Sequence, residues 1–323
     1  MPGAKKNILV TGGLGNLGSW VTDHFSGKDD YTVYVLTKND RSVDIAGSYT
    51  KLFGDISDMH SLLAGLGDHK FDYIVHLASI NESFLEGYPK QALLVNAYGT
   101  RNLLEACAGR GVKKFIYMST FHVYGRNGGL ITEDDEVRPL NDYAITHYFA
   151  EEYIRMFSQR SGMPYLILRL SNSYGCPKDV NSSKWYLLFN DLCRQAALKG
   201  KIEINTNGTA LRDFIHMQDV SMVIDWAIDA EELKDRVINL GSGQSVSLTR
   251  IADHIADAYR QEYEVEINIS KNESDATVHP SSLTFSIEKL RKAIGFNPTF
   301  CYTEEAGKIF RFIKQHAAAF KNA

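Results

Sequence analysis

Apolar residues gather in short runs along the first half of the chain, and stretches with helical spacing separate these runs. The runs are nearly continuous in apolar character, which is typical of strands buried on both faces of a sheet. They occupy residues 7–10, 31–36, 51–55, 71–77, 114–119 and 165–170. The clearest helical spacing of apolar residues lies between them, from Gln91 to Gly109. Strands that alternate with helices predict an α/β fold, a Rossmann-type doubly wound parallel sheet.

The alternation changes at about Ser171, where loops lengthen and helices follow irregularly. A short strand is predicted at 201–204 and a terminal helix at 302–322. We therefore expect a Rossmann domain and a smaller α+β lobe that binds substrate near the carboxyl ends of the strands. The Rossmann domain is expected at 1–170, rejoined by about 211–240, and the lobe mainly at 171–323.

A glycine-rich turn, Thr11 to Gly18, follows the first strand and precedes a helix expected at 19–25. Glycines let the backbone approach the pyrophosphate of a dinucleotide, and the N–H groups of the following helix face the anion. Its place between strand and helix favours this interpretation over a chance flexible loop. The residues expected to bind the cofactor here are Gly12, Leu14, Gly15, Asn16, Leu17 and Gly18.

The end of the second strand indicates the form of the cofactor. An acidic residue about 20 positions past the glycine turn would bind the adenosine ribose of NAD. This chain has neutral Thr37 there, beside Lys38 and Arg41. Cations suit a 2′-phosphate, so the sequence favours NADP(H) over NAD(H). The alternatives are Asp40 as a ribose partner and an ordinary solvated loop.

Composition excludes several classes of partner. The net charge is −4 without basic blocks, which argues against nucleic acid. No apolar run approaches the roughly 20 residues that span a bilayer, and residues 1–6 lack the apolar core of a signal peptide. The four cysteines have no metal-binding or redox spacing, so we expect buried thiols, no metal site and a cytoplasmic protein.

Further motifs follow the glycine turn in order along the chain. They are Gly54-Asp55-Ile56, His76-Leu77-Ala78-Ser79, Asn96 to Thr100, Ser119 to Gly125, Tyr143 to Glu151, Leu168 to Pro177 and Arg212 to Asp219. Together with the TGxxGxxG turn, these motifs resemble the extended short-chain dehydrogenases/reductases, in particular their NAD(P)-dependent nucleotide-sugar epimerases and dehydratases. The resemblance covers nearly the whole chain.

The resemblance implies further cofactor-binding residues. Asp55 would bind the adenine amino group, with Ile56 against the ring. The alternative for Asp55 is a turn aspartate that caps residues 57–60. Asn96 would stabilise the neighbouring sheet from within its helix. The middle of the cofactor would be lined by Leu77, Ala78 and Ser79.

The resemblance also implies the catalytic residues. Thr120 supplies the substrate-binding hydroxyl, and Tyr143 is the acid/base of the Tyr-x-x-x-Lys motif. The spacing of four places Tyr143 and residue 147 on one face of a helix, where both would also contact the cofactor. Residue 147, however, is His147 where the family has lysine.

This departure affects the acid/base chemistry. A phenol titrates near 10, so a tyrosine base near neutral pH needs a pKa lowered by about three units, or about 4 kcal/mol. A histidine is mostly neutral at pH 7 and keeps a ribose hydrogen bond without a permanent charge. Three interpretations stay open: His147 works partly protonated, catalysis is slower, or the chain is mainly a reductase in which Tyr143 begins protonated.

The resemblance implies a nucleotide-sugar substrate whose diphosphate binds Asn172 and Arg212. Dehydratases carry Asp-Glu after the active-site Thr, whereas this chain has Phe121-His122, so dehydration is disfavoured. The turn also lacks the cysteine of reductases that epimerise at C3 and C5. We expect hydride transfer at C4, as 4-epimerisation, oxidation or 4-keto reduction. His122 is an extra acid/base or a wall of the site.

Dimeric members of the family imply a homodimer formed through helices around 91–109 and 143–160. The second helix has more apolar residues than one core-facing stripe requires. They are Ile145, Tyr148, Phe149, Tyr153 and Phe157. The alternative function is a catalytically weak NADP(H)-binding or regulatory protein, which the loss of the lysine would permit.

Overall fold

The structure is a computed structural model that describes residues 5–81, 87–230, 236–299 and 301–320. The chain divides into two compact units, each with its own hydrophobic core. Unit 1 consists of Met1–Arg126, Glu133–Leu170 and Val220–Leu240. Unit 2 consists of Asn127–Thr132, Ser171–Asp219 and Gly241–Ala323.

Unit 1 contains a parallel sheet of seven strands in the order β11-β7-β5-β4-β1-β2-β3. The order reverses its direction between β1 and β4, so the sheet is doubly wound, as the sequence predicts. The strands are β1 (Lys6–Thr11), β2 (Tyr31–Thr37), β3 (Thr50–Phe53), β4 (Tyr73–His76), β5 (Lys114–Thr120), β7 (Tyr165–Leu170) and β11 (Val237–Leu240). The strands predicted for this sheet are all present, with ends that differ by at most two residues.

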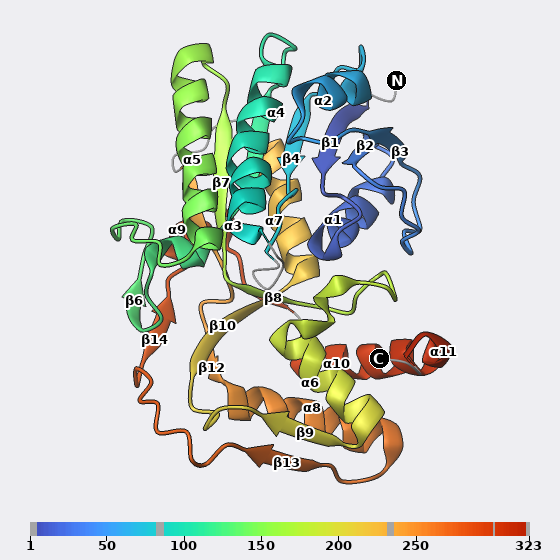
Figure 1. Cartoon of the computed structure of the whole chain (residues 1–323), viewed down its shortest axis with the longest axis vertical. Coiled ribbons are helices and arrows are strands. Elements are labelled where there is room, and N and C mark those ends of the chain that lie inside the picture. Colours follow the sequence, from blue (N-terminus) through green and yellow to red (C-terminus); the bar gives the residue numbers. More distant parts are fainter. Residues whose placement is uncertain (1–4, 82–86, 231–235, 300, 321–323) are drawn as a thin grey trace. The chain divides into compact units, whose positions relative to one another are not determined.

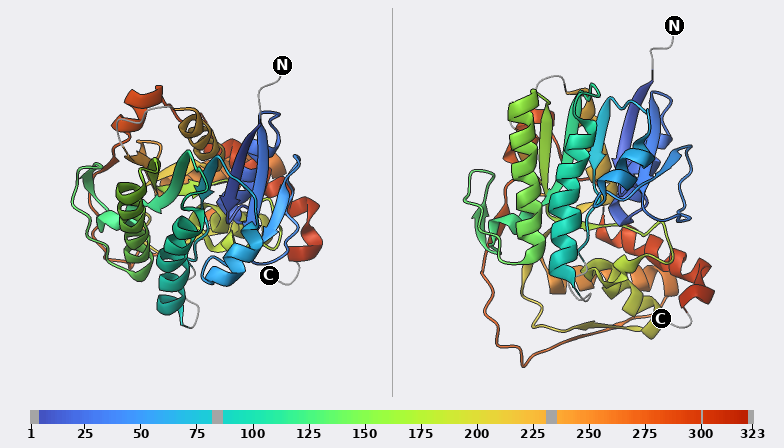
Figure 2. Two further views of the ribbon diagram at one scale, coloured as in Figure 1. Left: turned by 90° about the horizontal axis from the view of Figure 1, so that it is seen from above. Right: turned by 45° about the horizontal axis from the view of Figure 1, so that its top comes forward.

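Three helices, α2 (Met59–Leu66), α4 (Thr100–Cys107) and α5 (Asp142–Ser161), form a row against the sheet in Figures 1 and 2. Apolar side chains from the helices and from alternate strand positions form one buried core there. They include Leu9, Phe115 and Ile167 from the strands and Leu62, Leu104 and Ile154 from the helices.

The helix predicted from Gln91 to Gly109 has three parts in the structure. It begins as α3 (Tyr88–Ala92), continues as the π-helix η1 (Leu93–Gly99) and ends as α4. The π-helix contains Asn96, which is buried. Its side-chain oxygen accepts from the Ile80 N–H at 2.8 Å, and its side-chain nitrogen donates to the Ile80 carbonyl oxygen at 3.0 Å. Wide turns of this kind often occur at functional sites.

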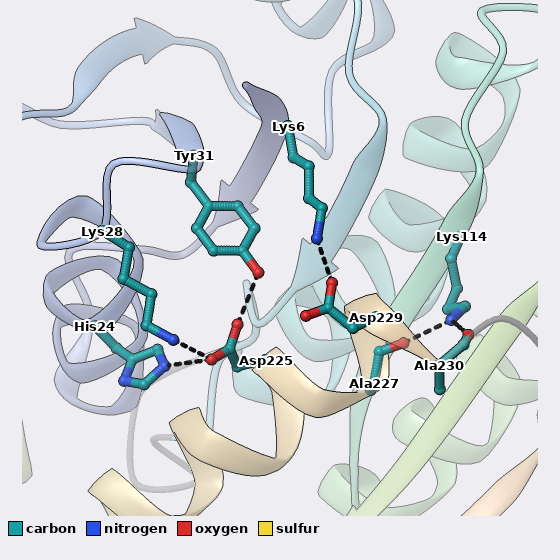
Figure 3. Close-up of polar contacts among 9 residues, drawn as sticks. All are labelled: Lys6, His24, Lys28, Tyr31, Lys114, Asp225, Ala227, Asp229 and Ala230. Carbon is teal, nitrogen blue, oxygen red and sulfur yellow. Dashed lines mark hydrogen bonds and ion pairs between the residues drawn. The ribbon is translucent and has the colours of Figure 1, made fainter. Parts of the chain in front are cut away.

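Helix α7 (Met217–Asp229) joins unit 1 through polar contacts with the amino ends of three strands (Figure 3). Asp225 accepts from Lys28, from His24 of α1 (Asn16–Ser26) and from the Tyr31 hydroxyl. Lys114 is buried, and its ammonium donates to the carbonyl oxygens of Ala227 and Ala230, at the carboxyl end of α7. These contacts explain why a helix encoded 47 residues after β7 belongs to this unit.

Unit 2 is an α+β unit with three small sheets. β10 (Leu211–His216) pairs with β8 (Asn172–Tyr174) and with β12 (Ser245–Ser247), so the return to unit 1 begins at Val220 and not near residue 211. The other paired strands are β9 (Lys201–Ile204) with β13 (Asn268–Lys271) and β6 (Gly129–Ile131) with β14 (Leu283–Phe285).

Helices of unit 2 enclose an apolar core that includes Phe189, Ile251 and Phe310. They are α6 (Leu188–Lys199), α8 (Leu248–Tyr263), α10 (Tyr302–Gln315) and α11 (Ala317–Phe320), with the 3₁₀ turn η3 (Ser183–Tyr186). Unit 2 also contains α9 (Glu288–Ile294). The predicted terminal helix is interrupted at His316, and its last two residues lie outside the described part of the chain.

Candidate active site

The glycine turn connects β1 to α1, and no side chain caps the start of α1. Gly12 has a positive φ of 69°, and a Cβ there would lie 2.8 Å from Cα of Ala78. A Cβ at Gly18 would overlap the Gly12 carbonyl oxygen. The helix begins at Asn16, earlier than predicted, because Gly15 is the extended residue before it. The first turn has no acidic residue, so the N–H groups at this helix end suit an anion.

Buried hydrogen bonds fix the turn to the neighbouring strand. Thr100 donates to the Asn96 carbonyl oxygen, so the Thr100 hydroxyl accepts from Nε2 of His76 at 2.8 Å. Nδ1 of His76 therefore accepts from the Thr11 hydroxyl at 2.6 Å. Burial lowers the pKa of His76 to about 3, which keeps the ring neutral. His76 is a structural residue that joins β1, β4 and α4.

The residues expected near the adenosine ribose lie at the ends of β2 and β3. The Lys38 ammonium is 2.8 Å from the Asp55 carboxylate, and Lys51 is 2.7 Å from Asp40. Thr37 donates to the Asn39 carbonyl oxygen. An ion pair thus joins the region expected near the ribose to Asp55, which was expected at the adenine, and both Asp55 and Asp40 are paired to a lysine.

Asp55 does not cap the helix that follows it. Asp58 is the N-cap of α2 and accepts from the Ser61 N–H, whereas Asp55 accepts from the N–H and hydroxyl of Ser57. The Ile56 side chain is 6% exposed and lies close to Gly99 of η1, so little of its surface is left for an adenine ring.

The loop after β4, which holds Leu77, Ala78 and Ser79, is partly or fully exposed. Asn96 holds the end of this loop at Ile80, and its amide also donates to the Thr146 hydroxyl of α5 at 3.1 Å. Asn96 therefore joins the loop to the helix that contains Tyr143, and both hydrogens of its amide are used within the protein.

The expected catalytic residues lie at the start of α5 and the end of β5. Asn141 caps α5 by accepting from the Ala144 N–H, so Tyr143 and His147 occupy its first turns. Their rings are 4.3 Å apart, and the His122 ring is 5.9 Å from Tyr143. His122 belongs to the 3₁₀ turn η2 (Phe121–Tyr124), and its N–H donates to the Thr120 hydroxyl. Thr120, Tyr143, His147 and His122 thus share one region of unit 1.

His147 is 2% exposed, and its Nδ1 lies 2.8 Å from the Tyr143 carbonyl oxygen. A carbonyl oxygen only accepts, so Nδ1 carries the proton and Nε2 has the lone pair of a neutral ring. Burial lowers the pKa of His147 to about 4, although the Tyr143 carbonyl and Glu151 act to raise it. Of the three interpretations of His147, partial protonation near neutral pH is the one that this environment opposes.

The buried ion pair between Glu151 of α5 and Arg169 of β7 was not predicted. Glu151 is fully buried and accepts two hydrogen bonds from Arg169 of β7, at 3.0 and 2.8 Å, and one from the Ser119 hydroxyl at 2.6 Å. Arg155 adds a contact at 2.9 Å from the more exposed side. The sequence signal was a charged residue within an otherwise apolar strand, Leu166-Ile167-Leu168-Arg169-Leu170. This pair fixes the rotation of the helix that presents Tyr143.

Unit 2 places Asn172 and Arg212 on the paired strands β8 and β10. Asn172 donates to the Asp213 carbonyl oxygen. The Arg212 guanidinium is half-buried and, within the described residues, hydrogen bonds only its neighbouring Leu211 carbonyl oxygen and forms no ion pair. Burial lowers the pKa of Arg212. A guanidinium in this setting suits an anionic group of a ligand.

The acidic and histidine side chains of the same motif have structural partners. Asp213 accepts from the N–H and hydroxyl of Ser242. His216 lies 3.1 Å from Glu305, and Asp219 accepts from the Thr299 hydroxyl at 3.0 Å. The motif therefore holds unit 2 together and leaves Arg212 as its candidate ligand-binding residue.

Neither a membrane-spanning helix nor a metal-binding group was found in the residues that the structure describes. None of their helices is long and apolar enough to cross a bilayer. They contain no cluster of three or more histidine, cysteine or acidic side chains arranged to hold a metal ion.

A doubly wound parallel sheet with a glycine turn at the start of α1 defines a Rossmann-type dinucleotide-binding protein. The chain belongs to the NAD dependent epimerase/dehydratase family, which matches residues 8–241. This finding confirms the resemblance seen in the sequence motifs.

Individual relatives include both kinds of enzyme. The chain is 28% identical over 341 residues to dTDP-D-glucose 4,6-dehydratase of Mus musculus, covering 98% of this chain and 91% of the mouse protein. It is 25% identical over 314 residues to UDP-glucose 4-epimerase of Rhizobium meliloti, covering 91% and 93%. The UDP-glucuronic acid 4-epimerase of Bacillus cereus, solved with UDP-glucuronic acid and NAD, has the same fold, with a TM-score of 0.77, 23% identity and coverage of 96% and 99%.

Proposed function

We propose that this chain transfers a hydride at C4 of a nucleotide-diphosphate sugar, with Tyr143 as the acid/base and Thr120 as a substrate-binding hydroxyl. The observation that carries the proposal is the grouping of Tyr143, His147 and His122 beside Thr120 in unit 1. Phe121 and His122 follow Thr120 where dehydratases have two carboxylates, so the elimination of water is disfavoured.

The substrate class rests on the family and on Arg212. Relatives of this chain act on dTDP-glucose and UDP-glucose by their names. Arg212 offers a guanidinium without an ion-pair partner in the described residues, and Asn172 lies on the adjacent strand, so both suit a diphosphate.

The test is turnover of the purified protein with NADH or NADPH and a panel of nucleotide sugars that carry either a 4-keto or a 4-hydroxy group. Conversion of any member at C4 supports the proposal. If the protein binds dinucleotide but converts no member of the panel, the alternative, a catalytically weak binding or regulatory protein, replaces it.

The glycine turn gives a prediction about cofactor binding. Gly15→Asp should weaken binding about 100-fold or more, because it places a carboxylate at the helix end expected to hold the pyrophosphate. Gly15 has a φ of −75°, and a Cβ there meets only the Gly12 carbonyl oxygen, at 3.1 Å, so the fold should tolerate the change. Titration of cofactor fluorescence measures the effect. Gly15→Ala is the matched control, and undiminished affinity of a folded Gly15→Asp variant would remove the assignment.

The form of the cofactor is a second prediction. The family is NAD dependent, whereas Thr37, Lys38 and Arg41 led us to predict a preference for NADP(H). If Lys38 exchanges Asp55 for a 2′-phosphate, NADPH should bind about fivefold more tightly than NADH at matched salt, and Lys38→Ala should abolish the difference. Lys51→Ala is the control. Tighter binding of NADH would make Asp40 the ribose partner to test.

We also propose a homodimer formed through η1, α4 and α5. Apolar side chains on these helices are exposed, among them Leu93, Tyr98 and Phe149, at 47%, 45% and 41%. Tyr98→Glu with Phe149→Glu should give a monomer, because charges would be buried in the contact. Val265→Glu, at an exposed apolar position of unit 2, is the control. Light scattering reports the mass, and a monomeric wild type at micromolar concentration would contradict the proposal.

A further inference from the structure

We propose that this site reduces a carbonyl and does not serve as a 4-epimerase, because His147, which is buried and donates from Nδ1 to the Tyr143 carbonyl oxygen, stands where the family has a lysine ammonium. The substrate is then a 4-keto nucleotide sugar. This inference rests on the proposed function and adds the direction of the reaction. A preceding oxidation or dehydration that leaves a carbonyl at C4 must supply such a substrate.

The hydrogen bond of His147 determines which nitrogen of the neutral ring donates and which accepts. Nδ1 donates to the Tyr143 carbonyl oxygen at 2.8 Å, so Nε2 is the nitrogen that accepts. A lysine at this position donates hydrogen bonds and brings a permanent positive charge. The buried His147 instead offers Nε2, a hydrogen-bond acceptor without charge. This acceptor would take a hydrogen bond from a ribose hydroxyl of a nicotinamide dinucleotide.

The groups around His147 do not supply the missing charge. From its own helix, Tyr143 presents a carbonyl oxygen, and Glu151 is already bound to Arg169, Arg155 and Ser119. No carboxylate of the described residues forms an ion pair with His147. The remaining titratable neighbours are His76 from β4, Tyr117 from β5 and His122 from η2.

The pKa of His147 agrees with this geometry. Burial lowers it to about 4, below the reference value near 6.5. Because the pKa in the folded protein is depressed, the ring is neutral at every pH above about 5 and gains its charge only on further acidification. Between pH 6 and 9, residue 147 therefore exerts a constant, uncharged influence on Tyr143.

The direction of the reaction follows from the proton that Tyr143 carries. Oxidation needs the phenolate, and only about one in a thousand of the phenols that titrate near 10 is deprotonated at pH 7. Reduction starts from the phenol and has no such limit. The carbonyl carbon gains a hydride from the reduced nicotinamide and its oxygen gains the Tyr143 proton, so the sugar is reduced, the dinucleotide is oxidised and water reprotonates Tyr143. An epimerase needs both directions at one pH.

The first experiment measures the ionisation of Tyr143 directly and needs no substrate. Tyrosinate absorbance is titrated from pH 6 to 11 for wild type and Tyr143→Phe, and the difference isolates Tyr143. The same pair is made in the His147→Lys background. The transition should move down by about one pH unit or more with lysine, since a nearby ammonium favours the phenolate. Equal midpoints in the two backgrounds would overturn the inference.

The second experiment compares pH–rate curves in both directions. The wild type should reduce a 4-keto nucleotide sugar at rates that vary less than about threefold from pH 6 to 8, and should oxidise the product about tenfold faster per pH unit in the same range. His147→Lys should shift the oxidation curve toward neutral pH. His147→Gln, neutral like the histidine, should keep the wild-type curve shape whatever its rate, which separates charge from mere packing.

The outcomes distinguish the two proposals. Oxidation at pH 7 as fast as reduction, or direct interconversion of 4-epimers, would overturn the reductive direction and leave the proposed function intact. Absence of turnover in both directions would overturn the proposed function, while the absorbance titration still reports whether residue 147 controls Tyr143.

Discussion

Replacing Tyr143 by phenylalanine should lower kcat by about 10³-fold, because the change removes the proton donor of the reaction and almost no volume. The phenol lies at the start of α5, in contact with His147 and His122, whereas the glycine turn lies at the start of α1. Cofactor affinity should therefore change by less than about threefold. Steady-state kinetics and a binding titration measure the two effects on the same preparation.

Tyr148→Phe is the matched control, since it removes a phenol from the same helix outside the proposed catalytic set. Its kcat should stay within about twofold of the wild type. Equal rates for wild type and Tyr143→Phe would mean that this helix is not catalytic. A parallel loss of cofactor binding would assign Tyr143 to binding alone.

Replacing Arg169 by methionine should destabilise the protein by about 3–5 kcal/mol. Glu151 is fully buried, and removing its two hydrogen bonds from Arg169 leaves a carboxylate with too few partners in a medium of low polarity. Methionine keeps most of the length of the side chain, so lost packing contributes little. Urea unfolding followed by circular dichroism measures the free energy of unfolding.

The double variant Glu151→Gln with Arg169→Met tests whether the charge is the cause. A neutral amide can keep the hydrogen bond from the Ser119 hydroxyl, so the double variant should recover about half of the lost stability or more. If the single and double variants are equally unstable, the loss comes from the shape of Arg169 and its contact with the Tyr124 ring. Both variants also report whether the position of Tyr143 depends on this pair.

The strands of the sheet could be predicted because burial on both faces demands continuous apolar residues, a property visible along the chain. The π-helix could not, because Leu93 to Gly99 has the apolar spacing of an α-helix. Its buried Asn96 bonds the backbone of Ile80, a pairing that the spacing does not reveal. The start of α1 was set too late because a glycine turn gives no side-chain cap to mark it.

The candidate site was predicted residue by residue where motifs set the spacing, as for Tyr143 and His147 one helical turn apart. The spacing could not predict the partners and the protonation of each side chain. Asp55 was assigned to adenine or to a turn over residues 57–60. It accepts from Ser57 in that turn and also pairs with Lys38, on another strand end, which the spacing did not reveal. His147 was compatible with partial protonation until its burial was known, because burial is a property of the packed helix and not of the motif.

The contacts between α7 and the sheet of unit 1 have a consequence for shortened forms of the chain. A fragment that ends at Leu170 holds six of the seven sheet strands but neither α7 nor β11. In that fragment the Lys114 ammonium has lost both carbonyl acceptors, and Tyr31, His24 and Lys28 have lost Asp225. Unit 1 therefore depends on contacts from Val220–Leu240, a segment that follows β8 and β10 in the chain, and a fragment without this segment should be less stable.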